Sequence, residues 1–153
     1  MIPNPYPGIF IIIDGIDGCG KSTQVRLLVE WLKRETYSAG RVVLETKEPD
    51  KTGPFGKIWP DAIFIIDVTP EVAIKRLKEN GRDMDGHENR EVLDRTRGHY
   101  MTFFRAYPNC IVIPDSGLVS PDTKSMNIRE HVEKLLKQKP ACGVQGRTDV
   151  SVS

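Results

Sequence analysis

The residues with the clearest chemical potential are Gly15-Ile-Asp-Gly-Cys-Gly-Lys21-Ser22, whose spacing is G-x-x-x-x-G-K-S. Glycines let the backbone curl so that successive N–H groups point at phosphate oxygens, and a following helix N-terminus adds partial positive charge. We expect Lys21 to reach the β- and γ-phosphates of a nucleotide and Ser22 to offer its hydroxyl to Mg²⁺. The bland alternative is a glycine turn that only joins a strand to a helix. It is disfavoured because an apolar run precedes the loop and an amphipathic segment follows it.

Phosphoryl transfer also needs a carboxylate near the metal, commonly at the end of a second apolar strand. Asp67, in Ile-Phe-Ile-Ile-Asp, is the nearest candidate, and Asp14 is a second one. For both residues a hydrogen-bonded carboxylate at a strand end is an equally acceptable interpretation. The Asn-Lys-x-Asp pattern that reads guanine is absent from the sequence, which disfavours a GTPase switch.

The cysteines set limits on other kinds of chemistry. Cys19, Cys110 and Cys142 are odd in number and form no C-x-x-C pair, so neither a disulfide framework nor a metal site is predicted. Cys19 lies close to Lys21 and a helix N-terminus, which favours an acidic thiol; its alternative role is simply a small side chain in the loop. A reducing, cytoplasmic location is the expected setting.

Charge and hydropathy exclude further classes of protein. The formal net charge is +1, with 22 basic and 21 acidic residues, so no overall attraction to nucleic acid or an anionic membrane is expected. The longest apolar run, Ile9 to Ile13, is too short to cross a bilayer, and Met1 to Pro7 lacks the basic start of a signal peptide.

The elements that must position the loop alternate between strand and helix. Residues 8–14 form a continuous apolar run that predicts a strand buried on both faces. Thr69 is a candidate N-cap before Pro70, and Gly81 ends that helix. Further strands are predicted at 41–46, 62–68 and 110–113, and helices at 22–37, 70–80, 88–107 and around 128–136. The pattern predicts an α/β fold of the P-loop NTPase type, with three layers and a mostly parallel sheet. Residues 1–137 are one domain in this interpretation, and residues 138–153 a disordered tail.

The residue types within the loop point to a narrower class of protein than its glycine and lysine spacing does. Asp14-Gly-Ile-Asp-Gly-Cys-Gly-Lys-Ser-Thr-Gln24 resembles the loop of thymidylate kinases, Glu-Gly-x-Asp-Gly-x-Gly-Lys-Ser-Thr. Thr46-Lys-Glu-Pro49, the run from Pro60 through Ile66–Glu71 to Arg76, and Arg95-Thr-Arg97-x-x-Tyr100 are similar to later segments of that family, in the same order. The resemblance covers about residues 8–137 and implies the reaction ATP + dTMP → ADP + dTDP with Mg²⁺.

The resemblance also implies roles for individual residues. Lys21 and Arg82 are the implied catalytic residues, Asp17 and Glu48 the implied acceptor-binding residues, and Ser22 the metal ligand. The first interpretation of Arg90, Arg95 and Arg97 is as charges on a helix surface, and the second is as phosphate ligands. In the family, the chain runs past the adenine at the position of Asp115-Ser-Gly117. A homodimer is implied as well. The implied ATP-binding residues are Gly15, Ile16, Asp17, Gly18, Cys19, Gly20, Lys21, Ser22 and Thr23.

One part of the family pattern is missing. Between Glu48-Pro49 and Pro60-Asp61 the family has several tens more residues, which include a strand that ends in Asp-Arg-Tyr or Asp-Arg-Phe. Without that strand, either residues 41–46 move over to pair with 9–14 or the apolar faces stay uncovered. Each unpaired buried backbone group would cost about 1–3 kcal/mol. We therefore predict a shortened kinase whose transfer activity is weak or absent. The alternatives are a protein that binds nucleotide without transferring phosphate, and a kinase of another nucleoside or nucleoside monophosphate.

Overall fold

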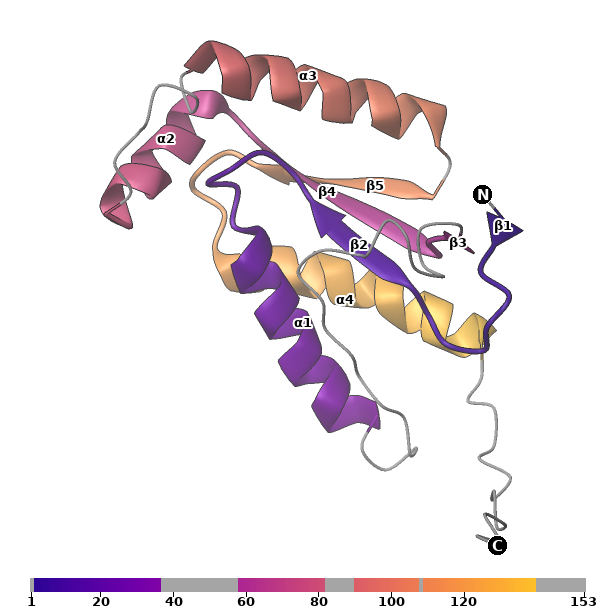
Figure 1. Cartoon of the computed structure of the whole chain (residues 1–153). Helices are drawn as coiled ribbons and strands as arrows, with labels where there is room; N and C mark the ends of the chain where they lie inside the picture. The colour runs from indigo at the N-terminus through magenta and orange to yellow at the C-terminus, as the bar shows by residue number, and fades with distance from the viewer. Residues whose placement is uncertain (1, 37–57, 82–89, 108, 140–153) are drawn as a thin grey trace, which may run out of the picture.

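The computed structural model of the chain describes residues 2–36, 58–81, 90–107 and 109–139 (Figure 1). The strands are β1 Ile2–Pro3, β2 Ile11–Asp14, β3 Ile58–Trp59, β4 Ala62–Val68 and β5 Cys110–Asp115. The helices are α1 Lys21–Thr36, α2 Pro70–Glu79, α3 Arg90–Ala106 and α4 Pro121–Gln138. The predicted strand at 41–46 lies outside the described residues, as does the predicted tail from residue 140 onward.

The central sheet is parallel, with β4 between β2 and β5. Ile11 to Asp14 pair with Ala62 to Ile65, and Ile63 to Val68 pair with Cys110 to Asp115. Because the three strands run the same way, their carboxyl ends meet at one edge of the sheet. The segment after β2, helix α2 and the segment after β5 all start from that edge (Figure 1).

Helices cover both faces of this sheet, so the molecule has three layers. Helices α1 and α4 lie together on one face and α3 lies across the other (Figure 1). The larger core cluster sits on the α1–α4 side. It contains Leu28, Trp31, Ala62, Phe64, Ile113, Ile128 and Val132. The predicted α/β fold with a parallel sheet and helices on both faces is thereby confirmed.

The strands β2 and β4 differ in burial, although both come from continuous apolar runs in the sequence. β4 is buried along nearly its whole length, as predicted. β2 is only half-buried at every position, so the prediction of a strand buried on both faces was wrong for it. Within the described part of the chain β2 has a paired neighbour on one side only, β4, and its side chains therefore lie at the margin of the helical cover.

Both ends of α2 lie close to where the sequence predicted them, but the predicted capping interaction is missing. Pro70 is the first helical residue and Thr69 occupies the N-cap position, but the Thr69 side chain makes no capping hydrogen bond. Gly81 follows the helix with a φ of 71°, a conformation that glycine adopts readily, and so it ends the helix as predicted.

A second, two-stranded parallel sheet was not predicted. β1 pairs with β3, and the carboxylate of Asp61 anchors the chain next to it. That carboxylate accepts hydrogen bonds from the Asn4 side chain (2.6 Å) and the Phe10 N–H (2.8 Å), and it lies 2.7 Å from the Lys139 ammonium. Asp61 therefore ties the N-terminal segment, the entrance to β4 and the end of α4 together.

The position of Phe64 leads to a prediction about stability. Its side chain is fully buried in the middle of β4, so Phe64→Ala should lower the free energy of unfolding by about 3–5 kcal/mol. Leu118→Ala is the matched control, because Leu118 is 94% exposed and its truncation should change stability by no more than about 0.5 kcal/mol. Urea unfolding of both variants measures the difference. Equal losses in the two variants would contradict the described core.

Candidate nucleotide-binding site

The glycine loop joins the carboxyl end of β2 to the first residue of α1, as predicted from its sequence. Gly18 and Gly20 have φ angles of 80° and 96°, in the region that side chains rarely adopt. A Cβ on Gly18 would also lie 2.5 Å from the Ala73 carbonyl oxygen of α2, so the loop packs directly on that helix. A hydrogen bond from the Cys19 N–H to the Ile16 carbonyl (3.1 Å) closes the turn.

Lys21 reaches back across the loop. Its ammonium donates to the Gly15 carbonyl at 2.6 Å and lies 3.4 Å from a carboxylate oxygen of Asp17. Ser22 follows in the first turn of α1, where its side chain is exposed and where the turn contains no acidic residue. The loop thus brings a cation, a hydroxyl and a helix N-terminus together, which is an arrangement suited to an anion.

A cleft of about 630 Å³ opens beside the loop. Its walls come from three parts of the chain: the loop with the start of α1, the second half of α2, and the segment after β5 together with the first turn of α4. The lining residues include three cations, Lys21, Arg76 and Lys124, and two acids, Asp17 and Glu79. This cleft is where the structure brings together the predicted phosphate-binding residues.

The surroundings of Cys19 distinguish between its two interpretations, an acidic thiol and a small side chain in the loop. The side chain is fully buried under the loop, in a cluster with Ile16, Ile66, Val68 and Ala73. Burial raises the pKa of its thiol, and the nearby Lys21 charge offsets only part of that effect. Burial and the raised pKa disfavour an acidic thiol at Cys19 and agree with the alternative, a small side chain in the loop.

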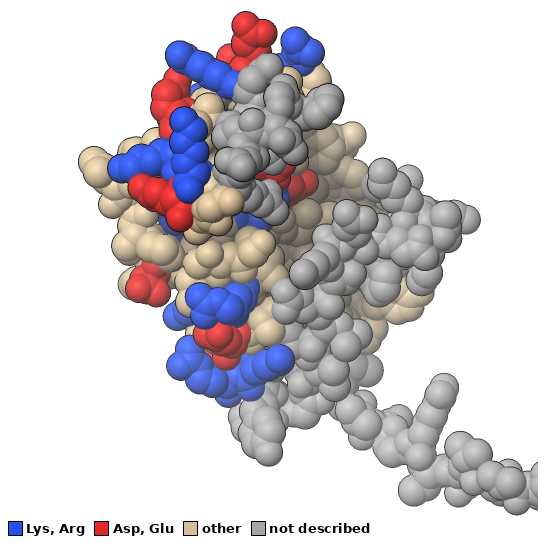
Figure 2. All heavy atoms as spheres, turned by 60° about the vertical axis from the view of Figure 1, so that its left-hand side comes forward, with Lys and Arg blue, Asp and Glu red and all other residues tan. Residues whose placement is uncertain are grey.

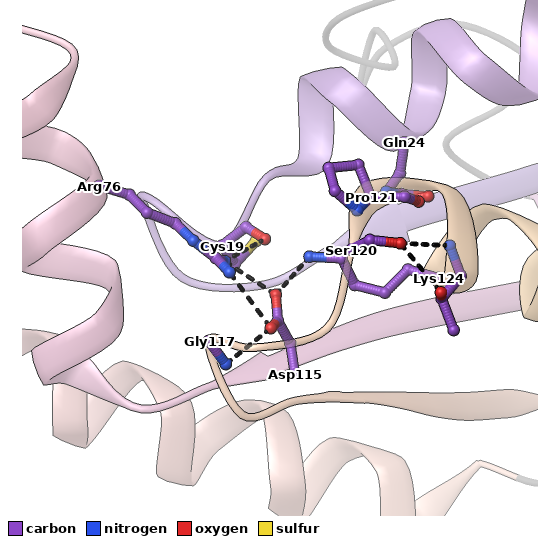
Figure 3. Close-up of polar contacts among 9 residues, drawn as sticks. Cys19, Gln24, Arg76, Asp115, Gly117, Ser120, Pro121 and Lys124 are labelled. Carbon is purple, nitrogen blue, oxygen red and sulfur yellow. Dashed lines mark hydrogen bonds and ion pairs between the residues drawn. The ribbon is translucent and has the colours of Figure 1, made fainter.

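One group of charged residues at the cleft was not predicted as a unit (Figure 3). The Asp115 carboxylate, at the end of β5, receives two hydrogen bonds from the Arg76 guanidinium (2.8 and 3.2 Å) and another from the Gly117 N–H (2.9 Å). The Lys124 ammonium also donates to it. Arg76 makes a further, longer contact of 3.4 Å with the Cys19 carbonyl of the loop. Three elements, β5, α2 and α4, thus meet the loop through one carboxylate.

The sequence did contain a signal for Lys124. It precedes Ile128 by four residues and Val132 by eight, so it lies on the same face of α4 as these buried apolar residues. A lysine on such a face needs a partner. The apolar residues that predicted this helix begin at Ile128, and Lys124 extends their face by one turn towards the N-terminus.

The candidate metal carboxylates are engaged with other protein groups. Asp67 forms a two-point ion pair with Arg97 (2.5 and 3.0 Å), so the alternative of a hydrogen-bonded carboxylate is the one found in the structure. Hydrogen bonding to Asp67 raises the pKa of Arg97. Asp14 accepts from the Tyr100 hydroxyl (2.9 Å) and the Gly15 N–H (2.8 Å), and burial followed by the Asp14 charge raises the pKa of Tyr100.

The remaining predicted site residues divide into two sets. Arg90 pairs with Glu71 on the surface (2.7 Å), and Arg95 is exposed on α3, in keeping with their interpretation as helix-surface charges. Glu48 and Arg82 lie outside the described residues. Over the described ranges, no group of three or more His, Cys, Asp or Glu side chains could hold a metal ion.

On the face drawn in Figure 2, basic and acidic side chains of the described residues are intermingled, as the net charge of +1 suggests. None of the described helices is both long and apolar enough to cross a membrane.

Fold and loop together define an α/β protein with a P-loop NTPase-like fold. Residues 13–59 match the family model of thymidylate kinase. A probable thymidylate kinase of Thermococcus onnurineus is 56% identical over 50 residues, which are 33% of this chain and 22% of that protein. The thymidylate kinase of Rhodopirellula baltica is 49% identical over 51 residues (33% of this chain, 19% of that protein), and that of Leifsonia xyli is 47% identical over 51 residues (33% and 22%).

The similarity that the loop predicted is thereby confirmed for the first part of the chain. Residues 13–59 are similar in sequence to thymidylate kinases. The match spans about a fifth of the length of the curated relatives.

The buried carboxylate of Asp115 predicts a dependence of stability on pH. Its burial alone would raise its pKa, but hydrogen bonds from Arg76 and Lys124 outweigh that effect and hold the pKa at about 2, against 3.8 for an unperturbed carboxyl. A lowered pKa stabilises the folded state above about pH 4, and this contribution, about 2 kcal/mol, is lost as the pH falls towards 2.

Asp115→Asn removes that titration. The variant should be less stable than the unmodified chain at about pH 5, and the difference in free energy of unfolding should shrink by about 2 kcal/mol towards about pH 2. Urea unfolding at several pH values measures it, with Asp94→Asn, an exposed residue of α3, as the control. A difference that stays constant with pH would contradict the role given to Asp115.

Proposed function

We propose that this chain binds ATP with Mg²⁺ at the loop of residues 15–23 and transfers the γ-phosphoryl group to dTMP, giving ADP and dTDP. The observation that carries the proposal is the loop itself. It has the geometry of an anion site at a helix N-terminus, and it lies in the segment similar to thymidylate kinases. The proposal includes a cytoplasmic location and a homodimer.

Binding would begin with an exchange of hydrogen bonds. In the structure the Lys21 ammonium is held by the Gly15 carbonyl and faces Asp17, both acceptors of the loop itself. A bound triphosphate offers stronger, charged acceptors, so Lys21 would turn to the β- and γ-phosphates. The backbone N–H groups of the loop and of the start of α1 would bind the remaining phosphate oxygens. These donors are held by the backbone, so no side-chain conformational entropy is lost when they bind.

The residues present fit a nucleotide-bound Mg²⁺. This ion keeps several waters and takes one or two protein ligands in addition to phosphate oxygens, so it needs no cluster of carboxylates. Ser22 has the exposed hydroxyl required, in the first turn of α1 beside the cleft. When bound, Mg²⁺ neutralises negative charge on the phosphoryl group being transferred. Lys21 supplies a second positive charge at the same place.

Fewer residues are proposed to bind the phosphoryl acceptor, dTMP, than to bind ATP. Asp17 lines the cleft with an exposed side chain, 3.4 Å from the Lys21 ammonium. It would accept a hydrogen bond from a sugar hydroxyl of the monophosphate once Lys21 turns to the phosphates. Glu48 and Arg82 complete the proposed set through the family resemblance alone. Because transfer depends mainly on holding donor and acceptor in line, the missing family segment should reduce turnover more than ATP binding.

A second candidate function is nucleotide binding without transfer. The observation in its favour is the ion pair of Arg97 with Asp67. The Arg97 guanidinium donates two hydrogen bonds to this carboxylate, so these two donors are already used within the protein. Arg90 is likewise paired with Glu71. Transfer to a different nucleoside or nucleoside monophosphate is the third candidate, and a panel of acceptors separates it from the first.

ATP binding is the first test. Lys21→Met should raise the Kd for Mg-ATP about 10- to 100-fold, because a charge-assisted hydrogen bond to phosphate is lost. Isothermal titration measures it, and Lys33→Met, an exposed lysine in the last turn of the same helix, should leave the Kd within about twofold. Absence of ATP binding in the unmodified chain would overturn both leading candidates.

Turnover is the second test. A coupled assay of ADP release should show dTMP-dependent turnover about 100-fold or more below that of the Rhodopirellula baltica thymidylate kinase, since poor positioning alone costs a factor of this order. Reactions without dTMP, and with other nucleoside monophosphates, are the controls. Turnover equal to the relative's would refute the predicted impairment. Intact ATP binding with no turnover on any acceptor would replace transfer by the second candidate.

A further inference from the structure

We propose that Lys124 is a positioning residue of the nucleotide site, acting through Asp115 and Arg76 on the carbonyl of Cys19. The inference rests on the proposed binding of ATP at the loop and goes beyond it. Lys124 lies outside the glycine loop, in the first turn of α4, about a hundred residues further along the chain. It belongs to no motif of the sequence interpretation.

The chain of contacts is continuous (Figure 3). Lys124 donates to one oxygen of Asp115, and the same oxygen accepts from Arg76 at 2.8 Å. The other Asp115 oxygen accepts from the second guanidinium nitrogen at 3.2 Å, so the plane of the guanidinium is fixed at two points. Arg76 then reaches the Cys19 carbonyl at 3.4 Å. Each member thus orients the next.

Burial makes this arrangement rigid. The Asp115 side chain has no exposed surface and that of Lys124 is 4% exposed, whereas the Arg76 side chain, nearest to the cleft, is 24% exposed. A buried lysine is costly unless its charge is paired, so Lys124 has little freedom to leave Asp115. Arg76 is the one member with access to solvent, and it lines the cleft with Lys124 and the loop.

The contact with Cys19 matters because of where this carbonyl lies. Cys19 stands between Gly18 and Gly20, two of the glycines whose positive φ angles shape the loop. Fixing the orientation of the Cys19 carbonyl also fixes the peptide plane that it shares with the Gly20 N–H, since the peptide bond is planar. In the proposed site the loop N–H groups receive the phosphates. Lys124 therefore helps to preset the loop for binding.

The network also leaves an excess of positive charge. Two cations face one carboxylate, so the group Arg76–Asp115–Lys124 carries a net charge of +1 next to the phosphate loop. A purely structural ion pair does not need the second cation. An anion site gains from it, because the field of the group favours a triphosphate.

Lys124→Met tests the proposal while leaving Asp115 paired with Arg76, so that the fold is retained. In the nucleotide-free protein, the ¹⁵N–¹H spectrum should show shifted amide resonances for Cys19, Gly20 and Lys21. The Kd for Mg-ATP should rise about 5- to 20-fold. Lys134→Met, an exposed lysine of the same helix that pairs with Glu130, is the matched control and should change neither.

A double-mutant cycle separates positioning from general stabilisation. Arg76→Gln should weaken ATP binding at least as much as Lys124→Met. Adding Lys124→Met to it should raise the Kd by clearly less than Lys124→Met does alone, no more than about threefold, because positioning through Arg76 is already lost and only the charge of Lys124 remains to be removed. Additive losses, or unshifted loop resonances in Lys124→Met, would overturn the proposal.

Urea unfolding of each variant confirms that the binding comparison is made on folded protein. Failure of the unmodified chain to bind ATP would refute the proposed function. The loop resonances would still decide whether Lys124 sets the conformation of the loop.

Discussion

The geometry of the candidate site depends on the burial of one carboxylate. Asp115 ends β5 with no exposed side-chain surface, and its charge is tolerable there only because two cations and a backbone N–H surround it. Those partners come from α2, α4 and the segment after β5. The requirement to satisfy this one charge therefore draws together the walls of the cleft, and Arg76 extends the same network to the phosphate loop.

The sheet makes this convergence possible. In a parallel sheet all carboxyl ends lie at one edge, so the loop after β2, the start of α2 after β4 and the segment after β5 meet without long connections. Ligand sites of open α/β sheets characteristically form at this edge. Gly18 allows the final approach, since any side chain there would collide with the backbone of α2.

Much of this could be predicted from the sequence, because local patterns specify it. The loop is defined by consecutive residues, and the strand 62–68 and the helices around it follow from uninterrupted or 3.6-residue apolar periods. What escaped prediction depends on distant partners. The half-burial of β2 reflects its neighbours, the β1–β3 pair joins segments far apart in the chain, and the ion pairs Asp67–Arg97 and Asp115–Lys124 link different elements. Glu48 and Arg82 lie outside the described residues and remain predictions.

Binding of the phosphates of ATP by the loop of residues 15–23 is the proposal on which the others rest. It is tested most directly by following the backbone amide resonances of the ¹⁵N-labelled chain during titration with Mg-ATP. The account predicts saturable shifts that are largest at Gly18, Gly20, Lys21 and Ser22, since their N–H groups lie where the loop meets the start of α1. Shifts confined to other parts of the chain, or none at all, would contradict it.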